Sequence, residues 1–273
     1  MASAVRPRIG VRGGLLGGTL LLVAAVELAA AWYGADPAAV DLRAIFAPPS
    51  LHHPLGADAL GRDLLARLAE GLRLSLSVAL LVVAISAAVG ISLGIFSARM
   101  GGWVDALLMR ITDIVLSFPG MLLAIALAAM LGPGIGNLVL ALTVVGWTGF
   151  ARLARAQTLS LQGMPFIEAA IGLGVGPWRL ARHHLLPVIA APLLVEASFG
   201  IASVMIGEAG LSFLGIGVQP PAASLGAMIR DGARVMLVAP ALVFWPGMLL
   251  FMLVLAANLL GDGLRDRLAR RGR

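Results

Sequence analysis

Residues 74–98 read LSLSVALLVVAISAAVGISLGIFSA, a run without a charged side chain. A helix that rises about 1.5 Å per residue over this length exceeds the roughly 30 Å of hydrocarbon in a bilayer. The apolar residues do not alternate with polar ones, so the run favours a helix over a strand of an outer-membrane barrel. The stretch therefore predicts an all-α membrane protein.

The composition extends this prediction to the whole chain. Of its 273 residues, 60% are hydrophobic and 12% are charged, and the mean hydropathy is +0.98. This balance excludes an ordinary water-soluble monomer. Six spans are expected, at about 15–34, 74–98, 107–131, 135–151, 187–213 and 236–260. The first is too long for the apolar core of a signal peptide and lacks a clear cleavage site, so we expect it to remain as a span.

The arginines predict the orientation, because cytoplasmic loops carry an excess of positive charge. All 20 basic residues are arginine. With a cytoplasmic N-terminus, 13 arginines fall on that side and 6 on the other, while Arg110 lies near a boundary. The 13 are Arg6, Arg8, Arg12, Arg99, Arg152, Arg155, Arg179, Arg182, Arg265, Arg267, Arg270, Arg271 and Arg273, and the 6 are Arg43, Arg62, Arg67, Arg73, Arg230 and Arg234. Both termini are therefore expected in the cytoplasm, and the pI of 11.4 reflects topology rather than a nucleic-acid partner.

Residues 152–186 form an expected cytoplasmic loop, whereas 35–70 and 214–235 are expected outside. Pro165 can begin a short helix, which the glycines between 172 and 176 must interrupt before a second helical piece. A compact helix at the membrane face can fit a groove on another protein or rest on the lipid surface. The spacing alone leaves both uses open.

The same loop, at about 163–187, resembles the EAA loop of ABC-importer permeases. Glu168-Ala169-Ala170 is followed after three residues by Gly174, and after nine more by a residue that is usually Ile. In that family the loop holds a coupling helix that docks in a cleft of a cytoplasmic ATPase. The resemblance implies that the contact includes Glu168, Ala169, Ala170, Gly174, His184, Leu186 and Pro187, with His184 at the Ile position.

Other stretches resemble the dipeptide, oligopeptide and nickel branch of that family, specifically its C-type subunit. They are His53–Asp63, Gly71–Leu76, Glu208–Gly217 with Gln219-Pro220-Pro221, and Asn258–Asp266. Departures are Ala57 for Thr, Leu225 for Trp, and a missing Asp-Pro at Ala269-Arg270. The resemblance implies a type I (MetI-like) permease fold of six transmembrane helices. We expect an N-terminal segment over 1–70, a permease core over 71–266 and a basic cytoplasmic tail over 267–273.

The resemblance also implies a function and partners. The chain would form half of a translocation pathway in the cell inner membrane for di- or oligopeptides, nickel or another small solute. Its partners would be a second permease subunit, two ATP-binding subunits, an extracytoplasmic solute-binding protein and membrane lipid. The alternatives are a self-sufficient secondary transporter or channel and a structural scaffold, but neither explains the EAA-like loop.

No catalytic site, cofactor or metal site is expected. The sequence has no GxxxxGK[ST] phosphate loop, so a separate subunit must hydrolyse ATP. It contains no Cys, and its four His form the adjacent pairs His52/His53 and His183/His184 rather than the i, i+4 spacing of a helical metal site.

Ionisable residues inside spans are costly and are candidates for pathway or intramembrane contacts. Arg110 and Asp113 lie three residues apart, which favours an ion pair on one helix face. Glu196 and Glu208 are twelve apart, so their directions differ by about 120° and their heights by about 18 Å, which argues against one carboxylate pair. Glu208 can line the pathway or hydrogen-bond into the bundle, and Glu27 suits a packing role.

Two stretches predict bends. Pro119 can kink the third span or serve as its hinge, and Gly132-Pro133-Gly134 can form a tight turn before the fourth span.

Overall fold

The structure, a computed structural model, describes residues 7–271, and its regular secondary structure is helical. The helices are α1 (Pro7–Tyr33), α2 (Leu64–Met100), α3 (Gly102–Leu116), α4 (Gly120–Leu131), α5 (Ile135–Leu161), α6 (Pro165–Gly172), α7 (Pro177–Leu180), the π-helical turn η1 (Ala181–Leu185), α8 (Leu186–Phe213), α9 (Leu225–Ala233) and α10 (Ala241–Arg271). Within 7–271 the β structure consists of an isolated bridge between Ala57 and Asp63. The all-α prediction is confirmed.

Five stretches are long and apolar enough to cross a membrane: Gly14–Tyr33, Leu64–Met100, Ile135–Leu161, Pro177–Phe213 and Ala241–Leu268. A sixth crossing exists if α3 and α4 count as one broken span.

The run predicted as one span over 107–131 is therefore two helices, which are bent by 85°. The break falls at Pro119, which lacks a backbone N–H and disfavours a helical conformation in the residue before it. The tight turn predicted at Gly132-Pro133-Gly134 is present, because Gly132 and Gly134 both have positive φ angles.

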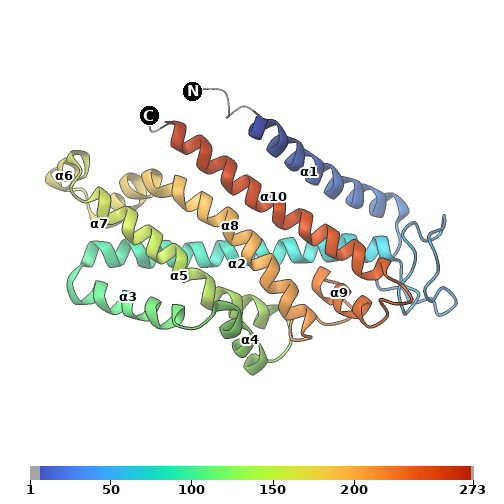
Figure 1. Cartoon of the computed structure of the whole chain (residues 1–273). Helices are drawn as coiled ribbons and strands as arrows, with labels where there is room; N and C mark the ends of the chain where they lie inside the picture. Colours follow the sequence, from blue (N-terminus) through green and yellow to red (C-terminus); the bar gives the residue numbers. More distant parts are fainter. Residues whose placement is uncertain (1–6, 272–273) are drawn as a thin grey trace.

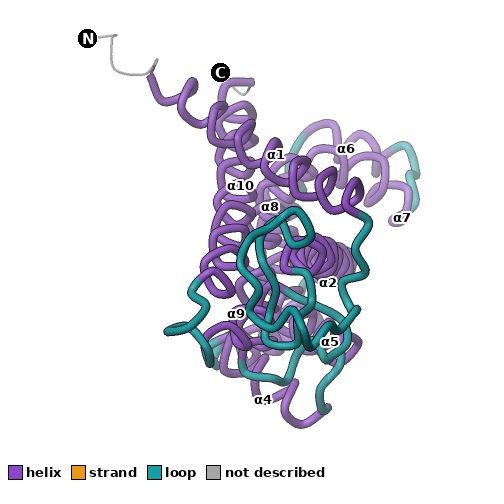
Figure 2. The backbone as a smooth tube through the Cα atoms, turned by 90° about the vertical axis from the view of Figure 1, so that its right-hand side faces the viewer, coloured by secondary structure: helices purple, strands orange, loops and turns teal. Residues whose placement is uncertain are grey.

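The helices run lengthwise between two ends of the molecule. Figure 1 shows α6 and α7 at one end, which we call the α6 end, and α10 ends toward the same side. The loop of residues 34–63 and α9 lie at the opposite end, which we call the loop end. Figure 2 looks onto the loop end, where this loop covers the start of α2.

Close approach of α2 and α5 forms the centre of the bundle. Gly90 and Gly94 lie one turn apart on α2, and an added Cβ on either would come well within 3.0 Å of the α5 backbone, at Trp147 and Ala151 respectively. Real Cβ atoms essentially never show such contacts. Small residues allow helices in a membrane to pack this closely, since lipid supplies little hydrophobic drive for their association.

Helix α5 is longer than expected and continues to Leu161. Arg152 and Arg155, which were predicted in a loop, therefore lie on this helix. The sequence from 152 to 161 contains neither Gly nor Pro, so nothing stops the helix where the apolar run ends. Just beyond it, Gln162 Nε2 donates to the Ala98 carbonyl oxygen at 2.7 Å and fastens α5 to the end of α2.

At the loop end, α9 is wedged among α2, α8 and α10. Leu225 is fully buried, and an added Cβ on Gly226 would collide with the backbone of Ala209 in α8. The side chain of Ser224 accepts a hydrogen bond from Ala227 N at 3.2 Å and caps the helix. An added Cβ on Gly71 of α2 would lie 3.3 Å from Leu225 N, so α9 also packs closely against the start of α2.

Candidate functional site

Helix α6 lies at the α6 end of the molecule, and two buried side chains hold it there. Ile167 is 1% exposed and Ala170 is 6% exposed, and both pack in a cluster that includes Leu180 and Leu185. Pro165 occupies the first helical position, where its missing N–H costs nothing. The predicted short helix is confirmed.

A glycine turn ends α6 in the expected place. Gly174 has φ +76°, and its N–H donates to the Ile171 carbonyl at 2.9 Å. The N–H of Val175 reaches the Ala170 carbonyl at 3.1 Å. This pair of bonds is the Schellman arrangement, which requires a residue in the left-handed region. The second helical piece, α7, follows at Pro177.

The EAA-like residues separate into exposed and buried positions. Glu168, Ala169, Gly174 and Pro187 are exposed, and His184 and Leu186 are half-buried. Ala170, by contrast, faces the interior of the chain. Because helix positions 167 and 170 share one face, Ala170 supports α6 from beneath and does not offer a free surface.

An exposed apolar surface lies near α6 and was not predicted from the sequence. Its members are Met164, Phe166, Ile171, Leu173 and Trp178, of which Leu173 is 85% exposed and Trp178 is 76% exposed. No helical period picks out this set, because Met164 precedes α6, Leu173 follows it and Trp178 lies in α7.

Charged residues of α3 pair with α5 rather than within α3. Asp113 binds Arg152 of α5, so the predicted pairing of Asp113 with Arg110 is wrong. One turn further along α5, Arg155 holds Asp105 with two hydrogen bonds, one of them 2.6 Å between Nη2 and Oδ2, and Ser97 also donates to Asp105. An arginine on a neighbouring helix thus outcompetes the local i, i+3 partner.

Glu208 is completely buried between α2 and α8. Its Oε2 accepts from Ser75 Oγ at 2.7 Å, and its Oε1 accepts from Ser212 Oγ at 2.8 Å. Ser212 Oγ in turn accepts from Val218 N at 3.2 Å. Of the two readings left open by the sequence, the structure supports hydrogen bonding into the bundle.

Replacing Glu208 by leucine should lower stability, because two buried hydroxyl groups lose their acceptor. Each unsatisfied hydroxyl costs about 1–3 kcal/mol. The control is Glu196→Leu on the same helix, since the half-buried side chain of Glu196 makes no hydrogen bond within the described residues. We expect a lower apparent Tm in detergent for Glu208→Leu and a small change for the control, whereas equal shifts would contradict this role.

The remaining candidates are dispersed. Glu196 faces a cavity of about 480 Å³ that is also lined by Phe199 and Arg265. Glu27 of α1 pairs with Arg73 of α2, in keeping with the expected packing role. Among residues 7–271, the structure therefore brings no set of intramembrane carboxylates into one site.

The motif His53–Asp63 closes the loop end. Asp63 caps α2 by accepting from Ala66 N at 2.9 Å, and its other oxygen lies 3.1 Å from His53 Nδ1. Gly61 has φ +71°, and an added Cβ would collide with the Asp41 carbonyl. The spacing of the motif thus reflects a folded cap on α2.

Comparison with known proteins assigns a class to this arrangement. Residues 90–273, about two thirds of the chain, match the family described as binding-protein-dependent transport system inner membrane component. The chain belongs to this family, the permease components of ABC importers. It is therefore a multi-pass inner-membrane protein of a system that also has an ATPase subunit, which hydrolyses ATP, and a solute-binding protein.

Two relatives share the description "glutathione transport system permease protein GsiD". The protein from Pectobacterium atrosepticum is 41% identical over 220 residues, which cover 81% of this chain and 73% of the relative. The protein from Escherichia coli O6:K15:H31 is 42% identical with the same coverage.

Solved structures show the same fold. Two inward-facing crystal forms of the MetNI methionine ABC transporter align with TM-scores of 0.56 and 0.59, at 18% and 20% identity. The alignments cover 72% and 73% of this chain and 95% of each matched chain. The type I, MetI-like fold predicted from the sequence is confirmed.

Proposed function

We propose that this chain is a permease subunit of an importer for glutathione or related short peptides. The observation that carries this proposal is the 41–42% identity to glutathione permeases over most of the chain. The motifs that resemble the peptide and nickel branch agree with a peptide substrate. A nickel complex is the second candidate, since the same branch serves that solute.

The chain supplies half of the pathway and pairs with a second permease subunit. Its permease core spans 71–266. Support comes from α3 and the α3–α4 connection, where Trp103, Leu107, Ile114 and Phe118 are all more than half exposed. A heterodimer with a similar subunit would cover part of this surface, and lipid the rest.

The α6 end, with both termini, faces the cytoplasm, and the loop end faces outward. The arginine excess supports this orientation, since 13 arginines would lie inside and 6 outside. Helix α6 then acts as the coupling helix on one of two ATP-binding subunits. The exposed Glu168 and the apolar side chains of Phe166 and Leu173 fit a protein groove, since apolar side chains fixed on a short helix are typical docking elements.

The substrate proposal is tested by transport in proteoliposomes. The full complex, with ATP enclosed in the lumen and the solute-binding protein outside, should accumulate labelled glutathione. Unlabelled di- and tripeptides should compete, and nickel should not. Uptake without ATP would favour the secondary-transporter alternative. Uptake of nickel but not of peptide would show that the substrate is a nickel complex.

A further inference from the structure

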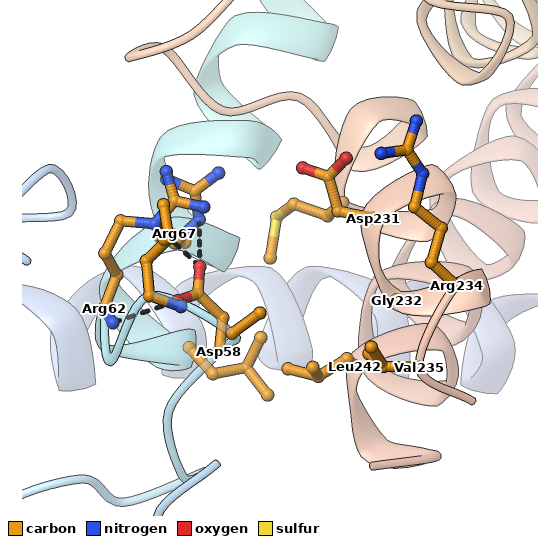
Figure 3. A pocket seen from close by; sticks show the side chains of 12 residues that line it. Asp58, Arg62, Arg67, Asp231, Gly232, Arg234, Val235 and Leu242 are labelled. Carbon is orange, nitrogen blue, oxygen red and sulfur yellow. Dashed lines mark hydrogen bonds and ion pairs between the residues drawn. The ribbon is translucent and has the colours of Figure 1, made fainter. Parts of the chain in front are cut away.

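A charged pocket lies at the loop end, between the start of α2 and the end of α9. Its volume is about 240 Å³, and its charged lining residues are Asp58, Arg62, Arg67, Asp231 and Arg234. Figure 3 shows Asp58, Arg62 and Arg67 on one side and Asp231 and Arg234 on the other. None of these residues belongs to α6 or to the buried Glu208 network.

The acidic groups of the pocket are already engaged. Asp58 accepts hydrogen bonds from Leu60 N at 2.8 Å, from Arg62 N at 3.0 Å and from Arg62 Nε at 2.7 Å. Asp231 is bound by Arg230 Nε at 3.1 Å. The negative charges of the pocket are thus largely matched by Arg62 and by Arg230, which lies outside the lining.

Two arginines have donors to spare. Arg67 is only 4% exposed, yet its two contacts are long, 3.4 Å from Nε to Asp58 and 3.4 Å from Nη1 to the Pro37 carbonyl. Hydrogen bonds of this type usually measure about 2.7–3.2 Å, and a guanidinium has five N–H donors. Arg234, on the opposite wall, has no ion pair within the described part of the chain.

We propose that this pocket binds a carboxylate group between Arg67 and Arg234. A guanidinium fork matches the two oxygens of a carboxylate, and a buried donor that lacks a close partner gains most from such a bond. The pocket is smaller than the roughly 300–1,000 Å³ typical of sites for whole small ligands. It therefore suits one carboxylate-bearing group rather than an entire peptide.

The carboxylate can come from the transported solute or from an acidic side chain of the solute-binding protein. Naming these two sources rests on the proposed function, which puts the loop end outside the membrane. The pocket itself rests on the geometry of Arg67, Arg234 and Asp231.

The test uses charge changes of opposite sign on exposed or half-exposed pocket residues, which spares the buried Arg67. Arg234→Gln removes a positive charge and should weaken binding roughly fivefold to tenfold, as expected for a charge-assisted bond. Asp231→Asn removes a competing negative charge and should strengthen binding. The matched control is Arg43→Gln, an exposed arginine of the same end that does not line the pocket.

Binding is measured on the complete complex in lipid nanodiscs, in two arms. One arm titrates the solute-binding protein of the same transport system, and the other titrates glutathione alone. The expected pattern is weaker binding by Arg234→Gln and tighter binding by Asp231→Asn. If this pattern occurs in the first arm, the carboxylate belongs to the binding protein. If it occurs in the second arm, the carboxylate belongs to the solute. If neither arm binds, or if both pocket variants behave like Arg43→Gln or weaken binding alike, the proposal is overturned.

Failure of the substrate proposal is distinguishable from failure of this one. A complex that imports no glutathione but shows the opposite shifts with its binding protein retains the carboxylate pocket and needs another solute. If the complex imports glutathione but the pocket variants do not change binding, the substrate proposal stands and the carboxylate pocket is refuted.

Discussion

Gly90→Leu is expected to abolish the accumulation of folded protein in the membrane. Any side chain at Gly90 must enter the backbone of α5 near Trp147, and a backbone cannot rotate away as a side chain can. Overpacking in a core costs about 1–3 kcal/mol even when neighbours can shift. Here α2 and α5 would have to separate, which would disrupt the packing at the centre of the bundle.

The control for this prediction is Ala84→Leu, which adds a similar apolar volume to an exposed position of the same helix. Size-exclusion chromatography of the fluorescently tagged chain in mild detergent measures the folded fraction. We expect a normal peak for Ala84→Leu and little or none for Gly90→Leu. A normal peak for both would show that the close contact of α2 and α5 is dispensable.

Gly174→Val is expected to uncouple ATP hydrolysis from transport. Gly174 ends α6 at φ +76°, a conformation that costs a residue with a side chain about 1–2 kcal/mol, and more for a β-branched one. The added Cβ itself would meet open space, so strain in the backbone is the cause. Opening the turn frees α6 to change direction, and uptake should fall on the order of tenfold, the equivalent of about 1.4 kcal/mol.

Two controls separate the turn from the side chain. Gly174→Asn should retain most uptake, because asparagine tolerates left-handed backbone better than valine. Gly176→Ala should also be mild, since Gly176 has no positive φ and an added Cβ there meets open space. ATP hydrolysis and solute uptake are measured together in proteoliposomes. Normal uptake by Gly174→Val, or equal loss in all three variants, would contradict a role for this turn in coupling.

Local rules predicted the parts of the structure that depend on neighbouring residues. Pro165 and Gly174 define α6 because proline and glycine restrict or extend the backbone where they stand. The break at Pro119 was visible for the same reason, but its 85° bend was not, since the angle depends on how α3 and α4 pack.

Contacts between distant residues could not be predicted. Glu208 finds Ser75 on another helix, 133 residues away, and no spacing rule links them. Asp113 likewise pairs with Arg152 of α5 rather than with Arg110, which is nearer in the sequence. The end of α5 was missed because the apolar pattern reports where a helix leaves the membrane and not where the helix ends.

The buried position of Ala170 shows how a motif can mix two roles. The EAA-like stretch offers Glu168 and Ala169 at the surface, while Ala170 holds the helix to the core. A motif read only as a contact surface therefore overstates the number of residues that a partner can touch.

Cross-linking from α6 tests most directly that this chain couples an ATPase to import. The chain has no Cys, so an Ala169→Cys variant places one thiol on the exposed side of α6. A Leu51→Cys variant places one at the loop end, where Leu51 is 95% exposed. With a reagent that carries one thiol-reactive group and one photoreactive group, we predict an adduct with the ATP-binding subunit from Ala169→Cys and none from Leu51→Cys in the assembled complex. An ATPase adduct from Leu51→Cys, with none from Ala169→Cys, would contradict the proposed orientation and the role of α6 as the coupling helix.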